Sequence, residues 1–452
     1  MDYYRITPMI VPADAESEIR IEPLFAHAEF TLDPSRIVVQ FFPWNGQMNE
    51  THYHSYDWIK ESPEMIVDDW HFDGRAIVLK KRFYGEQEFN IQVLEKNENG
   101  TVKCKRNFHL YSLKPDLYER RPFRGDIHIH TTGSDGKEEP RYTAARFREL
   151  GMDFASISDH RNYAPSIEAM EYWKELNPDY KLFPCEEVHA PGCIVHVLNF
   201  GGKYSVHKMS YEREDEFRRE VAELSKELPA DFSDESKFAI SSAEWVFREV
   251  KKAGGLAIFC HPYWYTEQYV VNSQVTDTIF KNRNFDAFEL LGGFYRKQVG
   301  SNNLQVIRYY EERAKGNIFP VTGSDDCHAT DRFDMEENKV NSKNAELTGW
   351  CSTLVFAKSC EYQDVADAIR AGYSVAMERI EGEMPRCFSD IRLAQYAIFL
   401  QKWYFPMHDV LCAAEGALML RVLSGDTFAR EALKSLHGSI ARYQKSVFGS
   451  NA

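Results

Sequence analysis

From Ile21 to about Leu113, apolar and polar residues alternate along the chain in short runs. Two such runs are Arg36-Ile-Val-Val-Gln-Phe-Phe and Glu88-Phe-Asn-Ile-Gln-Val-Leu. Alternation with a period of two indicates antiparallel strands that each bury one face. The segment Asn97-Glu-Asn-Gly is typical of a hairpin turn, because Asn and Gly tolerate positive φ. We therefore expect an N-terminal antiparallel β-sandwich over residues 1–122.

The pattern changes after a proline-rich and charged segment that runs from Lys114 to Arg124. Apolar runs that end at polar residues then alternate with helical stretches such as Tyr142-Thr-Ala-Ala-Arg-Phe-Arg-Glu-Leu. The runs are Asp126-Ile-His, Phe154-Ala-Ser-Ile-Ser, Lys181-Leu-Phe-Pro, Ile194-Val-His-Val-Leu, Leu256-Ala-Ile-Phe, Ala287-Phe-Glu-Leu-Leu and Ile318-Phe-Pro-Val-Thr. Such alternation predicts repeated βα units and a parallel α/β barrel over residues 123–385.

Two further regions are predicted to be helical. The charged stretch from Tyr211 to Lys226 fits an exposed helix inserted before the fifth apolar run. Residues 386–452 have the apolar spacing of a few packed helices, which cap the barrel or form a contact in a homo-oligomer. Both roles for this C-terminal extension stay open.

Composition narrows the class of protein. Of the 452 residues, 43% are hydrophobic and 14% aromatic, which favours a folded chain over a disordered one. The formal net charge of -15 repels polyanions, so we expect no binding along an extended duplex. The sequence shows neither a signal peptide nor a membrane-spanning run, which predicts a cytoplasmic protein with no membrane partner. The 9 cysteines are scattered and never form Cys-x-x-Cys, so we expect reduced core residues.

Candidate chemistry begins at Gly125-Asp-Ile-His-Ile-His-Thr-Thr-Gly-Ser-Asp-Gly136. Alternate side chains of a strand share a face, so His128 and His130 can bind one metal ion. Asp135 follows in the Gly-rich turn after the strand. The chain also contains His52 and His54 at the same spacing, but without this context, and we expect them in a polar loop.

The same combination recurs at the ends of later strands. The motifs are Ser156-Ile-Ser-Asp-His160, Pro184-Cys-Glu-Glu-Val188, His196 in the next run, Gly254-Gly-Leu-Ala-Ile-Phe-Cys-His261 and Val321-Thr-Gly-Ser-Asp-Asp-Cys-His328. Barrel enzymes place their catalytic groups at the carboxyl ends of the strands. Several histidine and carboxylate motifs at such positions favour a metal centre over a set of satisfied core histidines.

These motifs, in this order, resemble the PHP family, which is named for its polymerase and histidinol phosphatase members. The resemblance runs from about Arg124 to Glu381. The opening motif looks most like the branch of nucleotide and oligonucleotide phosphoesterases, because the histidinol phosphatase branch usually has histidine where this chain has Asp135. The resemblance implies a distorted (β/α)7 TIM-like barrel, preceded here by the β-sandwich, and a trinuclear metal centre.

The resemblance also implies a ligand set. One metal would be held by His128, His130, Glu187 and Asp326; Glu187 would bridge to a second metal on His196 and His261; and Asp135, His160 and His328 would hold the third. Glu187 and Asp326 are preferred to their neighbours Glu186 and Asp325 because they follow the family spacing, although neighbouring assignments can be exchanged. We expect two or three divalent ions, with Mn, Fe and Zn all suited to imidazole and carboxylate ligands.

Residues beside the motifs carry weaker expectations. His189 stands where the family usually has a small residue and is either a partner of a ligand or an ordinary loop residue. Asp159 is expected to orient His160, since a ligating histidine generally donates its other nitrogen to an acceptor. Asp126 is expected in a turn or at the barrel rim.

The implied activity is hydrolysis of a phosphate ester by a metal-bound hydroxide. The substrate would be a nucleotide, an oligonucleotide end or another small phosphorylated metabolite. Glu187, Asp326, His196 and Arg161 are the candidate catalytic residues, with Arg161 as the nearest phosphate contact. Arg141, Arg296 and Lys297 are weaker candidates, and all four cations could instead be solvated surface charges. Tyr163 and Tyr263 either stack a base or simply pack.

Two other functions stay open. A metal-dependent amidohydrolase acting on C–N bonds also begins with His-x-His, but that family usually bridges its metals with a modified lysine, whereas the third strand here supplies glutamates. A non-catalytic metal-binding sensor or scaffold is the other alternative. No motif of this chain is degenerate, which disfavours a scaffold.

Overall fold

The computed structural model describes residues 3–44, 66–266, 269–292, 295–331, 333–334, 339–340, 348–379 and 383–449. Two compact units emerge, the first from Met1–Arg121, Phe399–His408 and Gly438–Ala452, and the second from Pro122–Ile398 and Asp409–His437. The C-terminal region therefore contributes to both units. His52 and His54 lie outside the described residues, as do the side chains of Arg296 and Lys297.

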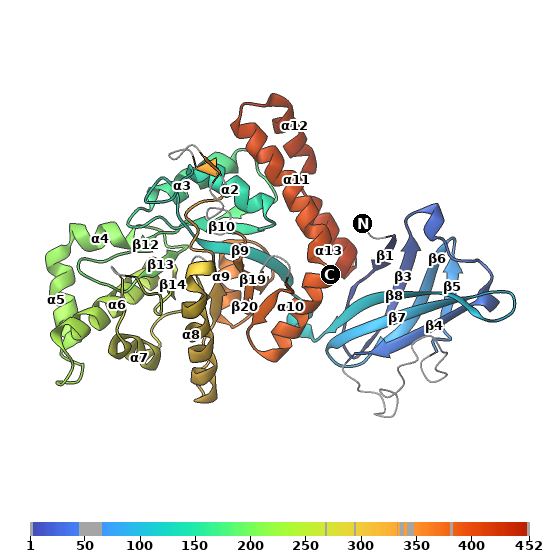
Figure 1. Cartoon of the computed structure of the whole chain (residues 1–452), viewed down its shortest axis with the longest axis horizontal. Coiled ribbons are helices and arrows are strands. Elements are labelled where there is room, and N and C mark those ends of the chain that lie inside the picture. The colour runs from blue at the N-terminus through green and yellow to red at the C-terminus, as the bar shows by residue number, and fades with distance from the viewer. Residues whose placement is uncertain are drawn as a thin grey trace. The chain divides into compact units, whose positions relative to one another are not determined.

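The first unit contains two four-stranded sheets, seen at the blue end of the chain in Figure 1. One sheet has the order β1-β3-β6-β5, and the other has the order β2-β8-β7-β4. Their strands are β1 (Tyr4–Thr7), β2 (Ile10–Pro12), β3 (Ala15–Pro23), β4 (Ile37–Pro43), β5 (Trp70–Asp73), β6 (Ala76–Phe83), β7 (Gln87–Lys96) and β8 (Val102–Leu113), with short 3-10 turns at Ala26–Ala28 and Pro34–Arg36.

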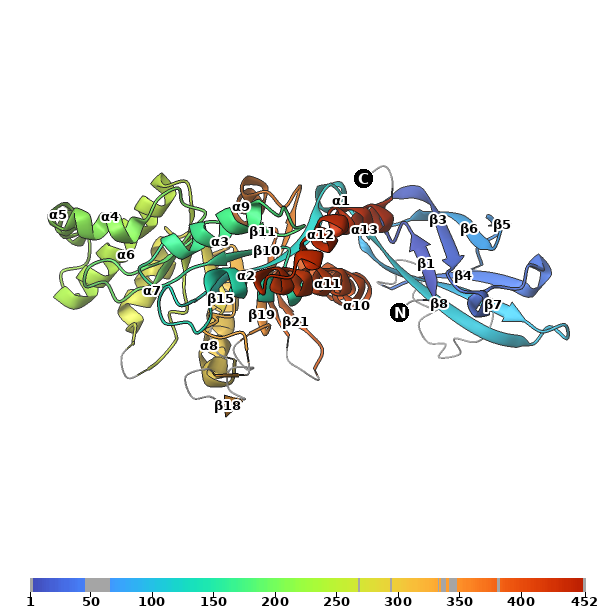
Figure 2. The ribbon, with the colours of Figure 1, turned by 90° about the horizontal axis from the view of Figure 1, so that it is seen from above.

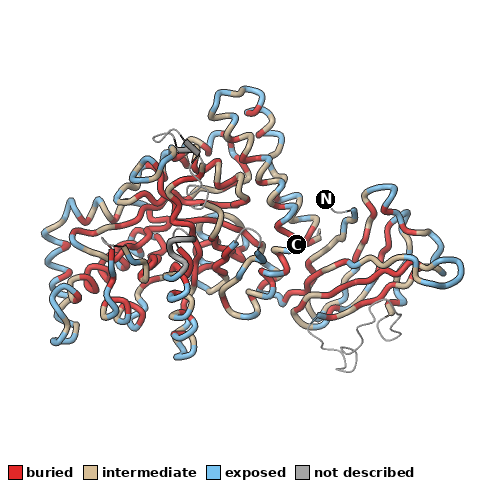
Figure 3. The backbone as a smooth tube through the Cα atoms, viewed as in Figure 1, coloured by how far each residue is buried: buried red, intermediate tan, exposed pale blue. Residues whose placement is uncertain are grey.

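One hydrophobic cluster joins these two sheets. It takes Ile19 and Ile77 from the first sheet and Val39 and Ile91 from the second. The predicted hairpin is present between β7 and β8, where Asn97 N donates to Thr101 O at 2.8 Å. Residues of both sheets are therefore buried in a shared core, and Figure 3 colours long parts of these strands as buried.

The second unit is built on two larger mixed sheets. A six-stranded sheet has the order β11-β10-β9-β19-β20-β21, and a five-stranded sheet has the order β12-β13-β14-β15-β16. The strands are β9 (Arg121–Ile129), β10 (Phe154–Ile157), β11 (Lys181–Leu182), β12 (Glu187–Val188), β13 (Val197–Phe200), β14 (Leu256–Phe259), β15 (Ala287–Leu291), β16 (Val321–Gly323), β19 (Cys351–Ala357), β20 (Ser374–Glu378) and β21 (Arg386–Phe388), beside a separate pair β17 (Phe333–Asp334) and β18 (Lys339–Val340).

Both units also contain helices. They are α1 (Pro115–Tyr118), α2 (Pro140–Glu149), α3 (Ala164–Lys174), α4 (Val206–Glu212), α5 (Glu214–Ser225), α6 (Asp234–Lys252), α7 (Ser273–Asn282), α8 (Tyr295–Ala314), α9 (Tyr362–Arg370), α10 (Ile391–Trp403), α11 (Phe405–Leu423), α12 (Thr427–Leu436) and α13 (Ser439–Phe448). The predicted inserted helix is present as α4 and α5, which lie next to α6 (Figure 2). Helix α6 in turn contacts β13 and β14. None of the described helices has an apolar run of the length that crossing a bilayer requires.

The mixed α/β class is confirmed, but the uniformly parallel sheet expected from sequence is wrong. Strand β13 pairs antiparallel with both β12 and β14, and β20 pairs antiparallel with both β19 and β21. Part of the reason is chain length: only residues 189–196 separate β12 from β13, and a parallel connection needs a crossover of about a dozen residues.

Two isolated bridges link the six-stranded sheet to the five-stranded one. Ile129 at the end of β9 pairs with Cys327, and His160 after β10 pairs with Glu187 of β12. His130 N donates to Cys327 O at 2.7 Å, and Glu187 N donates to Ser158 O at 3.0 Å. With these two bridges the strands form a closed order, β9-β10-β12-β13-β14-β15-β16, in which β16 is followed again by β9.

Candidate metal centre

The predicted ligands lie in successive strands of this closed order or within a few residues of them. His128 lies in β9, and His130 directly follows it; His160 follows β10. Glu187 begins β12, whereas His196 directly precedes β13. The remaining predicted ligands come after β14 and β16: they are His261, Asp326 and His328. Short buried strands therefore carry these side chains to one place.

Glu187 is the centre of the cluster. Its two carboxylate oxygens lie within 3.5 Å of five different imidazoles. The distances are 2.6 Å to His160 Nδ1, 2.7 Å to His196 Nδ1, 3.3 Å to His261 Nε2, 3.4 Å to His128 Nε2 and 3.5 Å to His130 Nε2. Atoms that share one ion at about 2.1 Å lie roughly 3–3.5 Å apart, so the distances from Glu187 to His261, His128 and His130 suit common ligands.

Two aspartates extend the cluster on one side. Asp326 Oδ1 lies 2.9 Å from His130 Nε2 and 3.4 Å from His128 Nε2. Asp135 Oδ1 lies 3.4 Å from His328 Nε2, and Asp135 Oδ2 lies 3.7 Å from His160 Nε2. The structure therefore brings every predicted ligand, from His128 to His328, into one group.

Several buried polar atoms of this group lack a hydrogen-bond partner among the described residues. They are His128 Nε2, His130 Nε2, both oxygens of Glu187, His196 Nδ1 and His261 Nδ1. A buried polar atom without a partner costs about 1–3 kcal/mol, and such atoms are rare in folded proteins. Divalent ions bound between these nitrogens and oxygens would satisfy nearly all of them at once, so the donor set fits a metal centre.

The electrostatics of the group also suit metal binding. Burial lowers the pKa of His130 and of His196 to about 3, which leaves both imidazoles neutral with a lone pair available. Burial alone would raise the pKa of Glu187, but the surrounding histidines, His160 first, hold it well below its usual value. Burial opposes charge on His160, but the carboxylates, Glu187 foremost, raise its pKa to about 9. Ionised carboxylates and neutral imidazoles are the forms that bind metals, so Glu187, His130 and His196 are already in those forms, whereas His160 must release a proton when a metal binds.

The neighbouring carboxylates point elsewhere. Glu186 accepts hydrogen bonds from Val206 N at 2.6 Å and Ser205 Oγ at 2.6 Å, and so holds the start of α4. Asp325 accepts from Cys351 N at 2.7 Å and from Trp350 N at 3.0 Å. Each of these two carboxylates is already satisfied by donors, unlike Glu187.

Glu289 was missed by the sequence analysis. It is fully buried in β15, and its Oε1 lies 2.8 Å from His128 Nδ1, whereas its Oε2 accepts from His261 N at 3.2 Å. A carboxylate that accepts a hydrogen bond from Nδ1 fixes the orientation of a histidine ring, so that Nε2 is directed at a metal. The available signal was a single Glu inside the apolar run Ala287-Phe-Glu-Leu-Leu.

Asp126 was also placed wrongly, because it is fully buried and lies neither in a turn nor at a rim. Its carboxylate accepts from His128 N at 3.0 Å and from Asp325 N at 2.9 Å, which ties β9 to the segment after β16. Burial raises the pKa of both Asp126 and Asp325, in the latter to about 7, which favours a retained proton in this pair.

Asp159 does not orient His160 as expected. It accepts from Thr131 N at 2.7 Å, Thr131 Oγ1 at 2.6 Å and Ser134 Oγ at 2.6 Å, and so fixes the turn after β9. A Cβ on Gly133 would lie 2.5 Å from Asp159 Oδ2, so this turn requires glycine. The partner of His160 is instead His189, whose Nε2 lies 2.9 Å from His160 Nδ1.

Three non-glycine residues of the site have positive φ. They are Arg161 at 59°, His261 at 22° and Asp326 at 48°. This backbone region is unfavourable for residues with a Cβ and persists where the surrounding structure imposes it, often at functional sites.

Arg161 and Arg141, the two predicted phosphate contacts with described side chains, lie in different surroundings. Arg161 is exposed at one wall of a cavity of about 770 Å³ beside α3 and α4, and its charge contributes to lowering the pKa of His189. Arg141 is occupied elsewhere, since it pairs with Glu168 at 2.9 Å and lies over the Tyr172 ring.

The two tyrosines considered for base stacking also differ. Tyr163 lines the same cavity as Arg161, but its hydroxyl donates to Gly202 O at 2.6 Å. Tyr263 packs against the core.

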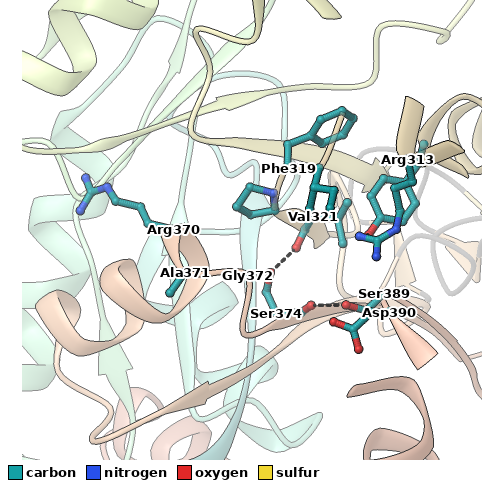
Figure 4. Close-up of a pocket in the computed structure, with 12 residues that line it drawn as sticks. Arg313, Phe319, Val321, Arg370, Ala371, Gly372, Ser374, Ser389 and Asp390 are labelled. Carbon is teal, nitrogen blue, oxygen red and sulfur yellow. Dashed lines mark hydrogen bonds between the residues drawn. The ribbon is translucent and has the colours of Figure 1, made fainter. Parts of the chain in front are cut away.

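A second cavity, of about 310 Å³, lies against the starts of β16 and β20 (Figure 4). Its walls include Arg313, Val321, Gly372 and Ser374. None of the site residues expected from sequence lines it, so it is separate from the metal-ligand cluster.

Comparisons with known proteins give distant structural similarities. No family model and no curated protein matches the chain. A two-domain protein from Bacteroides vulgatus that contains a predicted PHP-like metal-dependent phosphoesterase is 17% identical, with a TM-score of 0.38 over 58% of this chain and 66% of that one, just under two thirds. A protein from Bifidobacterium adolescentis, assigned as a metal-dependent phosphoesterase, is 20% identical, with a TM-score of 0.34 over 50% of this chain and 92% of its own. An amidohydrolase from Chromobacterium violaceum with bound sulfate and no metal is 14% identical, with a TM-score of 0.30 over 48% and 90%.

Proposed function

We propose that this protein is a metal-dependent hydrolase of phosphate esters. The observation that carries the proposal is the set of unpartnered buried nitrogens and oxygens around Glu187, in a cluster of imidazoles and carboxylates. Two or three divalent ions such as Mn, Fe or Zn suit these ligands. The substrate would be a nucleotide, an oligonucleotide end or a small phosphorylated metabolite.

In this proposal the closed strand order is the distorted (β/α)7 barrel of a PHP-type domain over residues 123–385. The seven strands β9, β10 and β12–β16 and their two bridges support it. The two sheets that share a core would be the sandwich of residues 1–122, followed by C-terminal helices in residues 386–452.

Each ligand group has a proposed role in binding. Glu187 would bridge two ions, with His128, His130 and Asp326 completing one site and His196 and His261 the other. Asp135, His160 and His328 would bind the third ion at the more exposed side, where the Asp135 side chain is 57% exposed. Glu289 would keep the Nε2 lone pair of His128 directed at its ion.

Divalent metals at such a site lower the pKa of a water to about 7 and offset the negative charge on phosphate. The chain itself would position the ester. Arg161, exposed beside the cluster, would donate to a phosphate oxygen, and the walls around it would hold the alcohol part of the substrate. The proposal requires no covalent bond between protein and substrate.

The test is elemental analysis of the purified protein, together with phosphate release from nucleotides, short oligonucleotides and sugar phosphates with added manganese. Two or three metals per chain with phosphate release is the expected result. Bound metal with no release from any ester would overturn the phosphoesterase proposal in favour of a C–N hydrolase or a metal-binding sensor.

A further inference from the structure

The cavity of about 310 Å³ at the starts of β16 and β20 has none of the predicted metal ligands in its walls, and we call it the β16–β20 cavity. Its walls come from α8, the segment before β16, the end of α9 with the loop after it, β20 and the segment before α10. Two hydroxyls connect these walls: Ser374 Oγ donates to Val321 O at 2.8 Å, and Ser389 Oγ donates to Ser374 O at 2.9 Å (Figure 4). All of them belong to the second unit.

Three charged side chains line the β16–β20 cavity, and one of them is already occupied. Arg370 donates to Gly255 O at 3.1 Å and pairs with Asp367 at 3.4 Å. Its guanidinium points away from the other labelled residues in Figure 4. Within the part of the chain that the structure describes, neither Arg313 nor Asp390 forms an ion pair. The cavity therefore offers one cation and one carboxylate to a ligand.

Two adjacent tyrosines of α8 bring these opposite charges to one region. Arg313 Nη1 donates to Tyr309 Oη at 3.1 Å, and Tyr310 Oη donates at 3.4 Å to Ser389 O, directly before Asp390. The centroids of the two tyrosine rings are 5.0 Å apart. Burial raises the pKa of Tyr309, Arg313 opposes that shift and Asp390 adds to it. Both charges therefore act on the same buried hydroxyl.

The size of the cavity limits the ligand. Its volume equals that of a sphere about 8 Å across, which is at the low end for ligand pockets and suits a small metabolite. An α-amino acid carries its ammonium and carboxylate roughly 3 Å apart, and a hydrogen bond of about 3 Å at each end lets it link groups up to about 9 Å apart. Arg313 and Asp390 are too far apart to pair directly but line the same small cavity. An α-amino acid fits between them.

The other walls suit an apolar side chain and an ammonium group. Phe319, Pro320 and Val321 provide an apolar surface. The hydroxyls of Ser374 and Ser389 give their protons to carbonyl oxygens, so their lone pairs can accept from an ammonium. Pockets of this kind, mostly apolar with a few polar groups, bind small molecules in a fixed orientation.

We propose that the β16–β20 cavity binds a free α-amino acid with an apolar side chain. The carboxylate of the ligand meets Arg313, its ammonium meets Asp390, and its side chain packs against Phe319 and Val321. Hydrogen bonds between charged groups are stronger than those between neutral ones, so binding depends on both charges of the ligand. The proposal is independent of the phosphoesterase activity, because no predicted metal ligand or phosphate contact lines this cavity.

Isothermal titration calorimetry with the intact chain tests this site. The probes are L-valine, L-leucine and L-methionine, followed by the N-acetyl derivative of the tightest binder, which lacks the ammonium, and its amide, which lacks the carboxylate. We expect the free amino acid to bind and each derivative to bind at least about tenfold more weakly. Absence of binding by all three amino acids at millimolar concentration would overturn the proposal. Equal affinity for the amino acid and its two derivatives would overturn it as well.

Matched variants test each charge. Arg313→Gln should bind the amino acid at least about tenfold more weakly and lose most of its preference over the amide. Asp390→Asn should weaken binding by a similar factor, and because Asn also caps helices, it should keep the bond in which Asp390 Oδ1 accepts from Leu393 N at 3.0 Å.

The control is Arg370→Gln, which changes a cation of the same cavity that already has partners in the protein. This variant should keep the full affinity for the amino acid. Circular dichroism should show that all three variants are folded. An unchanged affinity in Arg313→Gln or Asp390→Asn, or a loss of binding in Arg370→Gln alone, would contradict the proposed site.

Discussion

Two buried groups of charged side chains in the second unit differ in how their polar atoms are paired. Between α2 and α11, Arg148 Nε donates to Glu415 Oε2 at 2.6 Å, and Glu415 Oε1 accepts from Asp179 N at 2.8 Å. Around Glu187, by contrast, both carboxylate oxygens and several imidazole nitrogens have no partner in hydrogen-bonding geometry. Both groups are fully buried at their centres.

The two groups differ in the protons that their side chains carry. A guanidinium always carries its hydrogens, so Arg148 pairs directly with the Glu415 carboxylate, and Arg148 Nη2 is the atom of this group without a partner. Imidazoles and carboxylates can present lone pairs to one another, and cations between them satisfy those lone pairs. Buried charge alone therefore does not identify a functional site, whereas several unpartnered imidazole and carboxylate atoms in one cluster favour a metal site.

The strongest test of the comparison is Glu187→Gln. An amide binds metals poorly and cannot bridge two ions, so we expect loss of bound metal and a fall in phosphoesterase rate of at least about 10³-fold. The protein should remain folded by circular dichroism. Glu186→Gln, a neighbouring carboxylate that holds α4, should retain metal and most activity. The reverse ranking would refute the ligand assignment.

The second test removes the paired group. Glu415→Ala leaves Arg148 buried without its carboxylate, which should lower the free energy of unfolding by about 3–5 kcal/mol in urea titrations. The metal content of the folded fraction should not change. Glu431→Ala, on the exposed face of α12, is the control and should have little effect. If the Glu415→Ala protein lost its metal while fully folded, the Arg148–Glu415 group and the cluster around Glu187 would depend on each other, which would contradict the comparison.

The third test weakens the metal group indirectly. Glu289→Gln keeps the volume of the side chain but removes the charge that holds His128 Nδ1, so metal affinity should fall about 10–100-fold. Competition with a chelator measures this change. The control is Glu244→Gln, because the Glu244 carboxylate accepts from Asn282 and Asn284 and not from a predicted ligand. An unchanged affinity in Glu289→Gln would show that His128 needs no such partner.

The smallest effect concerns a paired carboxylate in the first unit. Burial would raise the pKa of Glu95, but hydrogen bonds from Lys103 and Arg106 outweigh it and lower the pKa. The stabilisation is therefore present above the ordinary glutamate pKa of 4.5 and is lost as the pH falls through the depressed value. Glu95→Gln should flatten the dependence of thermal stability on pH below about 4.5 relative to the native protein. An unchanged slope would mean that the pair adds no stability.

The sequence predicted those features that local pattern controls. Alternation of side chains along one strand placed His128 and His130 on the same face, and the hairpin at Asn97 followed from its turn residues. Strand-end motifs predicted the residues of the cluster because parallel and mixed sheets gather such ends. The predicted ligands come together in one cluster.

Features that depend on distant partners could not be predicted. Glu289 meets His128 across 161 positions, and nothing near Glu289 in the sequence indicates that contact. Asp126 was expected in a turn or at the barrel rim, yet it is buried and accepts a hydrogen bond from the distant Asp325 N. The antiparallel position of β13 depends on pairing with β14, which is separated from it by three helices.

The two isolated bridges that complete the strand order, Ile129 with Cys327 and His160 with Glu187, lie at or directly beside the residues that would bind metal. Anything that binds only the folded state adds to its stability in proportion to the logarithm of its concentration over its Kd. In the proposed metal centre, metal loading and closure of the strand order would therefore be thermodynamically coupled. The amide hydrogens of His130 and Glu187, which form the bridging bonds, will exchange with solvent more slowly as metal occupancy rises.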